Sequence, residues 1–238
     1  MAGVDIGRKR WPGHPHAGVD ESHPLAHGLV TLYGKLFGAK RGRVTADFTA
    51  ATVNGSFGVS AEVGTGVIIT AATGTGSAAP PVTFGAVFRF ISSSGEMHLL
   101  TNDNGASVNG TSFANRCWQF RCTTGTLQFL AFDTGGGSLP IDFTLAITSG
   151  VPYAAIVSVS ADRDAEMRLI NLSTSEITVV SSTASSTGNW AGADSDTAAA
   201  GQRLTTEGRV SAVYRWNRNL TSQEMDMFLA DPFCMLRV

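Results

Sequence analysis

The chain has 238 residues, of which 43% are hydrophobic and only 15% are charged. This length suits one large domain or two small ones, and the apolar content excludes an intrinsically disordered chain. A formal net charge of −2 gives no overall positive field for nucleic acid, and no apolar run approaches the ~20 residues that a membrane helix needs. Residues 1–13 lack the apolar segment of a secretory signal, so we expect none.

Residues 1–27 are predicted to form an extended, irregular N-terminal arm. Prolines and glycines interrupt this stretch, and it has few large apolar side chains. Such a segment cannot bury a core of its own, so it must lie on the domain, lie on a partner or stay mobile. A basic cluster beside a tryptophan would orient it onto an acidic surface or onto another copy of the chain, although ordinary solvated charge explains the pattern equally well. This cluster consists of Arg8, Lys9, Arg10 and Trp11.

From residue 28 onward the sequence predicts β-structure. Short runs rich in β-branched and aromatic residues alternate with clusters of Gly, Ser, Thr, Asn and Asp, as in strands joined by tight turns. Residues 82–91, for example, place three phenylalanines on one face of a strand. About a dozen such strands predict an all-β, two-sheet antiparallel jelly-roll sandwich over residues 28–238. The side chains expected in its core are Phe84, Phe88, Phe90, Trp118, Phe120, Phe129, Ile156, Val157, Val159, Leu169, Val213 and Tyr214.

One short helix is predicted near the C-terminus. Thr221 and Glu224 have the spacing of a capping box, in which each residue satisfies a backbone N–H of the other. Three apolar side chains then fall on one stripe, and Asp231 followed by Pro232 ends the helix. The stripe consists of Met225, Phe228 and Leu229.

The three cysteines are expected to be reduced thiols. Cys117 and Cys122 fall on opposite faces of one predicted strand, which disfavours a disulfide between them, and Cys234 is far away in the sequence. With an odd number of cysteines and no expected secretory signal, small apolar packing groups are the simpler interpretation. The sequence has no CxxC zinc pair.

Three segments resemble a known family. Residues 22–33 resemble the "SHPLA-x-GLV" opening common in phage and prophage proteins with concanavalin A-like (laminin-G-like) domains. Residues 54–69 resemble the "G-x-F-G-x-A" strand pair of that fold, and residues 213–233 resemble its "YNRALS-x-x-E…DP" ending, in which the last strand leads into a short helix. The order and spacing of the three segments point to a concanavalin A-like sandwich.

This resemblance implies a bacteriophage virion structural protein rather than an enzyme. Such a protein would decorate the capsid or tail as a homo-oligomer, bind other virion proteins, and join the virion during assembly in the host cytoplasm. Its N-terminal arm would dock through the basic cluster at residues 8–11. The alternative is a glycan-binding adhesin or lectin module that binds host glycans on the virion or cell surface. Its candidate ligand loops carry Asn102, Asp103, Asn104, Asp133 and Trp190.

Asp162, Asp164 and Glu166 are the strongest catalytic candidates. At alternate positions of a strand their carboxylates would share one face, as in laminarinase-type hydrolases of the same fold, which cleave glycosidic bonds with paired carboxylates. These acids also lie between two predicted strands, where a turn is needed and Asp is a common turn residue. We therefore interpret the segment as a hairpin turn and expect no catalytic residues.

No metal or cofactor is expected. Imidazoles and carboxylates in the arm could bind zinc, but the prolines and glycines between them leave the ligands unordered. The loops near residues 102–105 and 133–135 could offer oxygens to Ca²⁺ or to sugar hydroxyls, although Asn-Gly turn chemistry explains them too. A nucleophile elbow and a phosphate loop are both absent from the sequence, so neither a serine hydrolase nor a nucleotide site is expected. The arm's metal candidates are His14, His16, Asp20, Glu21, His23 and His27.

Overall fold

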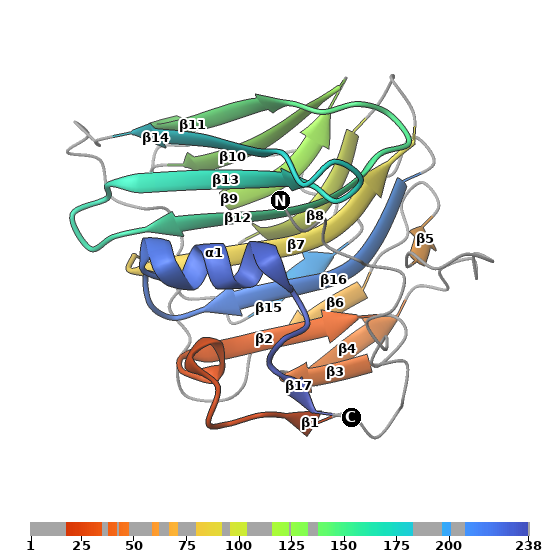
Figure 1. Cartoon of the computed structure of the whole chain (residues 1–238), viewed down its shortest axis with the longest axis vertical. Coiled ribbons are helices and arrows are strands. Elements are labelled where there is room, and N and C mark those ends of the chain that lie inside the picture. Colours follow the sequence, from red (N-terminus) through yellow and green to blue (C-terminus); the bar gives the residue numbers. More distant parts are fainter. Residues whose placement is uncertain are drawn as a thin grey trace.

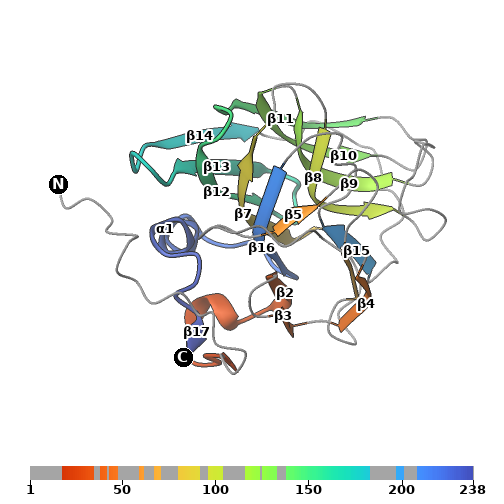
Figure 2. The same cartoon turned by 90° about the vertical axis from the view of Figure 1, so that its right-hand side faces the viewer.

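The structure of the chain is a computed structural model, and two antiparallel β-sheets dominate it. Figure 2 shows the sheets packed face to face, with the single α-helix lying on the outer side of one of them. The structure describes residues 18–34, 38–41, 43–47, 59–61, 67–70, 80–91, 96–103, 116–123, 125–132, 138–182, 197–200 and 208–237.

The sheet under the helix, here called the helix-side sheet, has eight strands (Figure 1). Along it the order is β14 (Ile177–Ser182), β13 (Ala165–Asn171), β12 (Pro152–Val159), β7 (Val82–Phe90), β16 (Gly208–Trp216), β2 (Leu29–Gly34) and β3 (Gly38–Arg41), and β5 (Val59–Ala61) pairs with the beginning of β16. The far sheet has seven strands: β11 (Ser138–Ala146), β10 (Thr126–Phe132), β9 (Arg116–Thr123), β8 (Glu96–Asp103), β15 (Thr197–Ala200), β6 (Val67–Thr70) and β4 (Arg43–Asp47).

A short strand pair, a 3₁₀ turn and the helix complete the fold. β1 (Gly18–Val19) pairs with β17 (Leu236–Arg237), and the 3₁₀ turn η1 (Pro24–Ala26) precedes β2. The helix α1 (Ser222–Ala230) packs over β12 and β13. The prediction of an all-β, two-sheet antiparallel sandwich with one short C-terminal helix is confirmed. Within the residues described, no helix has the length and apolar character to span a membrane.

The predicted core residues are all buried, but they divide between two apolar clusters. Alternate side chains of β7 explain the division, because Phe84, Phe88 and Phe90 point between the sheets while Val87 points outward beneath α1. Between the sheets the ring centroids of Phe84 and Trp118 lie 4.1 Å apart. The helix-side sheet is therefore covered on both faces.

The helix begins and packs as the sequence predicts. The Thr221 hydroxyl accepts a hydrogen bond from the Glu224 backbone N–H at 3.3 Å, and the Glu224 carboxylate accepts one from the Thr221 N–H at 2.9 Å. Its apolar stripe meets β7 at Gly85, where a Cβ atom would lie only 3.0 Å from the Phe228 ring. A glycine at this position therefore lets the aromatic side chains of α1 and β16 approach the sheet closely.

The described part of the N-terminal segment packs against the sandwich. Residues 18–27 fall within the stretch for which an arm is predicted, yet β1 pairs with β17 and Leu25 is completely buried in η1. The His23 ring nitrogen Nδ1 accepts a hydrogen bond from the Leu25 N–H at 3.2 Å, which holds the start of η1. Residues 1–17, which include the basic cluster, lie outside the described residues.

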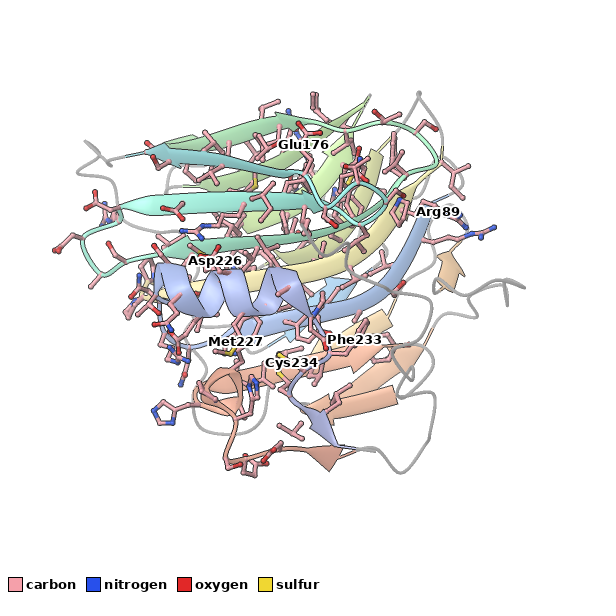
Figure 3. The ribbon with its side chains drawn as sticks, viewed as in Figure 1. Arg89, Glu176, Asp226, Met227, Phe233 and Cys234 are labelled. Carbon is pink, nitrogen blue, oxygen red and sulfur yellow. The ribbon has the colours of Figure 1, made fainter. Side chains whose placement is uncertain are left out.

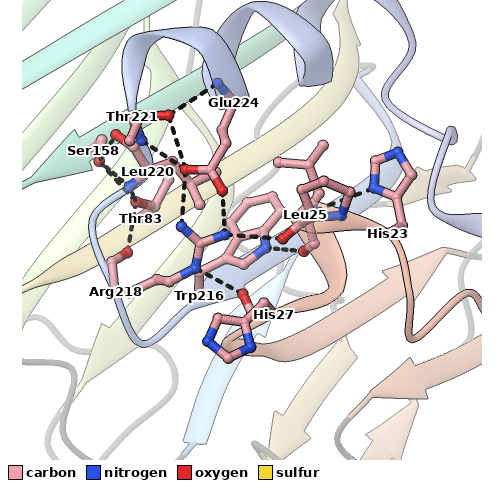
Figure 4. A network of polar contacts seen from close by, with 11 residues as sticks. His23, Leu25, His27, Thr83, Ser158, Trp216, Arg218, Leu220, Thr221 and Glu224 are labelled. Carbon is pink, nitrogen blue, oxygen red and sulfur yellow. Dashed lines mark hydrogen bonds and ion pairs between the residues drawn. The ribbon is translucent and has the colours of Figure 1, made fainter.

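Two of the segments that carry the family resemblance bind each other (Figure 4). The Trp216 indole N–H donates to the Leu25 carbonyl oxygen at 2.6 Å. The Arg218 guanidinium donates to the carbonyl oxygens of His27 at 2.8 Å and Pro24 at 3.1 Å. Residues from both ends of the chain therefore form one hydrogen-bonded network, here called the terminal clamp, which comprises Pro24, Leu25, His27, Trp216, Arg218 and Glu224.

The terminal clamp also anchors the helix. Arg218 donates to both carboxylate oxygens of Glu224, at 2.9 and 2.7 Å, and Glu224 is the residue that completes the capping box. These hydrogen bonds lower the pKa of Glu224 to about 2, although partial burial of the carboxylate opposes the shift. The residues of the terminal clamp, which come from the first and last of the three segments that carry the family resemblance, therefore stabilise the fold.

Candidate functional site

A polar pocket of about 400 Å³ lies at one end of the helix-side sheet. It forms where the turn between β12 and β13, the end of β14 and the N-terminus of α1 come together, and these elements meet on the left in Figure 1. Polar and apolar atoms share its wall almost equally, and the polar ones are hydroxyl, carboxylate and amide groups. The lining residues are Ser158, Ser160, Asp164, Ala165, Glu166, Ser181, Ser182, Asn219, Leu220, Thr221, Ser222 and Met225.

The turn between β12 and β13 positions Asp164 at the pocket. The Ser160 N–H donates to the Asp164 carbonyl oxygen at 2.8 Å, and the Ser160 hydroxyl accepts from the Asp164 N–H at 3.1 Å. Arg163 closes the turn with a φ of 70°, in the left-handed region. The interpretation of residues 162–166 as a hairpin turn is confirmed for residues 162–164, but Ala165 and Glu166 already belong to β13. Of the three predicted acids, Asp164 and Glu166 line the pocket.

The floor of the pocket is built from polar groups that already have partners. The Ser158 hydroxyl lies 2.8 Å from the Thr83 hydroxyl, and the Leu220 N–H reaches both, at 2.9 and 3.1 Å. Thr83 in turn donates to the Arg218 carbonyl oxygen at 2.8 Å, which links the floor to the terminal clamp. This buried network fixes the strand ends and the start of α1 relative to each other.

The rim, in contrast, carries polar groups without protein partners. Within the described part of the chain, no hydrogen bond involves the carboxylate of Asp164, the hydroxyls of Ser181, Ser182 and Ser222, or the side-chain amide of Asn219. Met225, Leu220 and Ala165 also line the pocket, but their side chains are almost completely buried. A rigid floor beneath uncommitted donors and acceptors is the arrangement expected for a site that binds a hydroxyl-rich ligand.

The Glu166 carboxylate is less available to a ligand than the Asp164 carboxylate. Its carboxylate pairs with Arg168, whose guanidinium also contacts Asp226 on α1 and donates to the Ser222 carbonyl oxygen at 3.2 Å. Burial lowers the pKa of Arg168, but the hydrogen bonds to the two carboxylates outweigh it and the net shift is upward. Arg168 therefore holds α1 to β13, and the Glu166 carboxylate is occupied by its ion pair with Arg168. The described lining residues include no histidine or cysteine, so only these two acids offer proton-transfer chemistry.

Two of the other predicted site residues lie on a strand of the far sheet. Asn102 and Asp103 belong to β8, where they pair with Trp118 and Arg116, so the strand continues through the first two positions of the predicted ligand loop. The remaining loop candidates, and the basic cluster with its tryptophan, lie outside the described residues. They are Arg8, Lys9, Arg10, Trp11, Asn104, Asp133 and Trp190.

The metal hypothesis receives no support from the described residues. Among them no three His, Cys, Asp or Glu side chains gather as a metal site would require. Asp20 accepts hydrogen bonds from the backbone N–H and hydroxyl of Ser22, at 3.0 and 2.6 Å. Of the arm's candidates, His14 and His16 lie outside the described residues. Cys122 is a buried free thiol, as predicted for that position.

Most of the pocket could not be predicted from the sequence. Ser181 and Ser182 end β14, and Asn219 and Ser222 lie on either side of the predicted helix cap at Thr221. These residues become neighbours only through the pairing of β12, β13 and β14 and the docking of α1. An excess of serine near strand ends was the available signal, and it does not specify which ends meet.

Comparison with solved structures shows that the fold is shared with β-sandwich binding domains. The botulinum neurotoxin serotype D binding domain is similar with a TM-score of 0.60 and 8% identity over 86% of this chain and 52% of that chain. The binding domain of botulinum neurotoxin DC in complex with SialylT gives 0.58 and 10% identity over 85% and 51%. A sialidase from Trypanosoma rangeli in complex with sialic acid gives 0.56 and 14% identity over 88% and 34%.

These similarities define the fold and extend no further. The chain spans about half the length of the neurotoxin domains and about a third of the sialidase. The sequence matches no family model and no curated protein. The chain is therefore a two-sheet β-sandwich with a pocket at the end of its helix-side sheet.

Proposed function

We propose that this chain is a glycan-binding module and not an enzyme. The observation that carries the proposal is the polar pocket, in which Asp164, Ser181, Ser182, Asn219 and Ser222 have side chains without hydrogen-bond partners among the described residues and lie above a fixed floor. Sugars present hydroxyls that pair with such groups and C–H faces that pack on apolar side chains. The fold is compatible with glycan binding, since the solved proteins of which a part shares it include a neurotoxin binding domain in complex with SialylT.

A non-catalytic role fits the acids of the pocket. Hydrolysis of a glycosidic bond normally uses two carboxylates that face the sugar from two sides. Here Arg168 binds Glu166, while Asp164 lies on a turn at the rim. We propose that Asp164 accepts hydrogen bonds from ligand hydroxyls and that Glu166 keeps its structural contact with Arg168.

Glycan-array screening followed by calorimetry tests this proposal. Because a hydrogen bond to a charged group is worth about 1.5–3 kcal/mol, Asp164→Asn should weaken binding of the best glycan from the array by about tenfold or more. The matched control is Asp162→Asn, which removes the same charge from the same turn but does not line the pocket, and it should leave the affinity unchanged. A blank array with folded protein, or equal losses in the two variants, would contradict the proposal.

A second candidate role is decoration of a phage virion. The resemblance of residues 22–33 to the opening of phage and prophage proteins favours it, and a surface sandwich can both decorate a particle and bind a glycan. In this role the chain would act as a homo-oligomer bound to capsid or tail proteins through Arg8, Lys9, Arg10 and Trp11.

Deletion of residues 2–17 tests the virion role. This deletion ends before β1, so the pairing of β1 with β17 is retained and the sandwich should keep its unfolding midpoint. We expect the full chain to co-sediment with particles and the truncated chain to lose this association. Equal incorporation of both chains would contradict docking through the arm.

A further inference from the structure

Two arginines face each other across neighbouring strands of the helix-side sheet. Arg89 on β7 and Arg209 on β16 are direct cross-strand partners in the antiparallel register. Like charges placed directly opposite each other destabilise a sheet. On either side the row continues with Pro152 on β12 and Ser60 on β5, so the four paired positions contain no carboxylate.

The arginine pair lies on the outer face of the sheet. Phe88 and Phe90, the neighbours of Arg89 along β7, both belong to the cluster between the sheets, and alternation turns Arg89 the other way. Figure 3 places Arg89 at the end of β7 that lies away from the polar pocket. The opposite end of β7 pairs with β12 near that pocket, through Val82 and Val159. The two features therefore occupy opposite ends of one sheet.

Among the described residues, no carboxylate pairs with either guanidinium. Both side chains are half-buried, and each buried Nε atom lacks a hydrogen-bond partner in the part of the chain that the structure describes. Burial, and then the charge of Arg209, lowers the pKa of Arg89. A guanidinium nevertheless stays protonated at neutral pH, so both positive charges persist. The sheet thus holds two adjacent, partly desolvated cations whose Nε donors lack hydrogen-bond partners among the described residues.

We infer that Arg89 and Arg209 form a binding site for one oxyanion: a carboxylate, sulfate or phosphate group. A guanidinium presents parallel N–H donors that match the oxygens of such a group, and an anion held between two of them would remove their mutual repulsion. The register of β7 and β16 places the two residues directly opposite each other on one face of the sheet, so both guanidinium groups can reach the same anion. This inference is independent of the polar pocket and stands if no neutral glycan binds there.

Calorimetric titration with sodium sulfate, sodium phosphate and sodium glucuronate tests the site at constant ionic strength. We expect saturable binding of one anion per chain, and the comparison of glucuronate with the inorganic ions shows whether the site prefers an oxyanion carried on a sugar. Arg89→Gln and Arg209→Gln should each raise the dissociation constant about tenfold or more, because each removes a charge-assisted fork. Arg163→Gln makes the same change of net charge at the turn between β12 and β13 and should leave binding intact.

Stability measurements separate a binding role from a packing role. Without added anion, Arg89→Gln and Arg209→Gln should not lower the unfolding midpoint, since each relieves a like-charge contact. If either variant fails to fold, Arg89→Lys and Arg209→Lys keep the charge but lose the planar fork, and they should also weaken binding. The inference is overturned if the wild-type chain shows no saturable binding of any of the three anions, or if binding persists unchanged in the variants of both arginines.

Discussion

Replacement of Trp216 with alanine is expected to lower the free energy of unfolding by about 3–5 kcal/mol, the range for large aromatic side chains removed from a core. Trp216 is completely buried, stacks on Tyr214 with a centroid separation of 5.7 Å, and meets Phe228 edge-on at 5.8 Å. Its indole N–H also satisfies the buried carbonyl of Leu25. The substitution would therefore leave a cavity beneath α1 and an unpaired acceptor in η1.

Urea unfolding monitored by circular dichroism measures this loss. Trp216→Phe separates the contribution of the ring contacts from that of the hydrogen bond to Leu25. Phenylalanine keeps most of the ring contacts but cannot donate to Leu25, so we expect it to cost about 1–2 kcal/mol. A loss below about 1 kcal/mol for Trp216→Ala would contradict the view that this side chain joins η1, β16 and α1.

Arg218→Ala is expected to lower the free energy of unfolding at neutral pH. It should also remove the main cause of the fall in that free energy at acid pH. The pKa of Glu224 is about 2 in the folded chain and about 4.5 in an unpaired carboxyl, chiefly because Arg218 donates to it. A lowered carboxyl pKa stabilises the fold above pH 4.5, and this contribution is lost as the pH falls toward 2. A shift of this size corresponds to at most about 3 kcal/mol of stability at pH 7.

Denaturation at several pH values measures the effect. The wild-type chain should lose stability steadily between pH 4.5 and pH 2, and Arg218→Ala should start lower and show a shallower slope over that interval. Glu176→Gln is the matched control, because it removes an exposed carboxylate from the turn between β13 and β14 and should keep the wild-type slope. An unchanged slope in Arg218→Ala would show that other carboxylates dominate acid unfolding.

Local patterns in the sequence were sufficient to predict much of the fold. Alternation along residues 82–91 identified β7 and its inward face, and the Thr221–Glu224 spacing identified the cap of α1. Both signals depend on residues close together in the sequence, where the strand and helix periods act directly. The division of the core into two clusters was not predicted, because it depends on α1 covering the outward residues of β7, β12 and β16.

The N-terminal segment shows where local patterns were insufficient. Residues 18–27 have no strand or helix period and few apolar groups, so an arm was the natural prediction. Leu25 is nevertheless buried, and the carbonyl oxygens around it receive donors from Trp216 and Arg218. Irregular backbone can pack when side chains from elsewhere satisfy it, and those donors are nearly two hundred residues away in the sequence.

The candidate sites could not be predicted from local patterns either, because they depend on the register of paired strands and on the docking of α1. Asp164 and Glu166 drew notice as acids, but their serine neighbours come from β14 and from the start of α1. The opposition of Arg89 and Arg209 follows from the pairing of β7 with β16, across a stretch of more than one hundred residues. Both sites required the three-dimensional structure for their identification.

Backbone amide chemical shifts of isotope-labelled chain, recorded during titration with the best glycan from the array, test the central claim most directly. We expect the perturbed amides to gather at Asp164, Ser181, Ser182, Asn219 and Ser222, with little change at the opposite end of β7. Shifts that avoid these residues, or that survive unchanged in Asp164→Asn, would show that the polar pocket is not the glycan site.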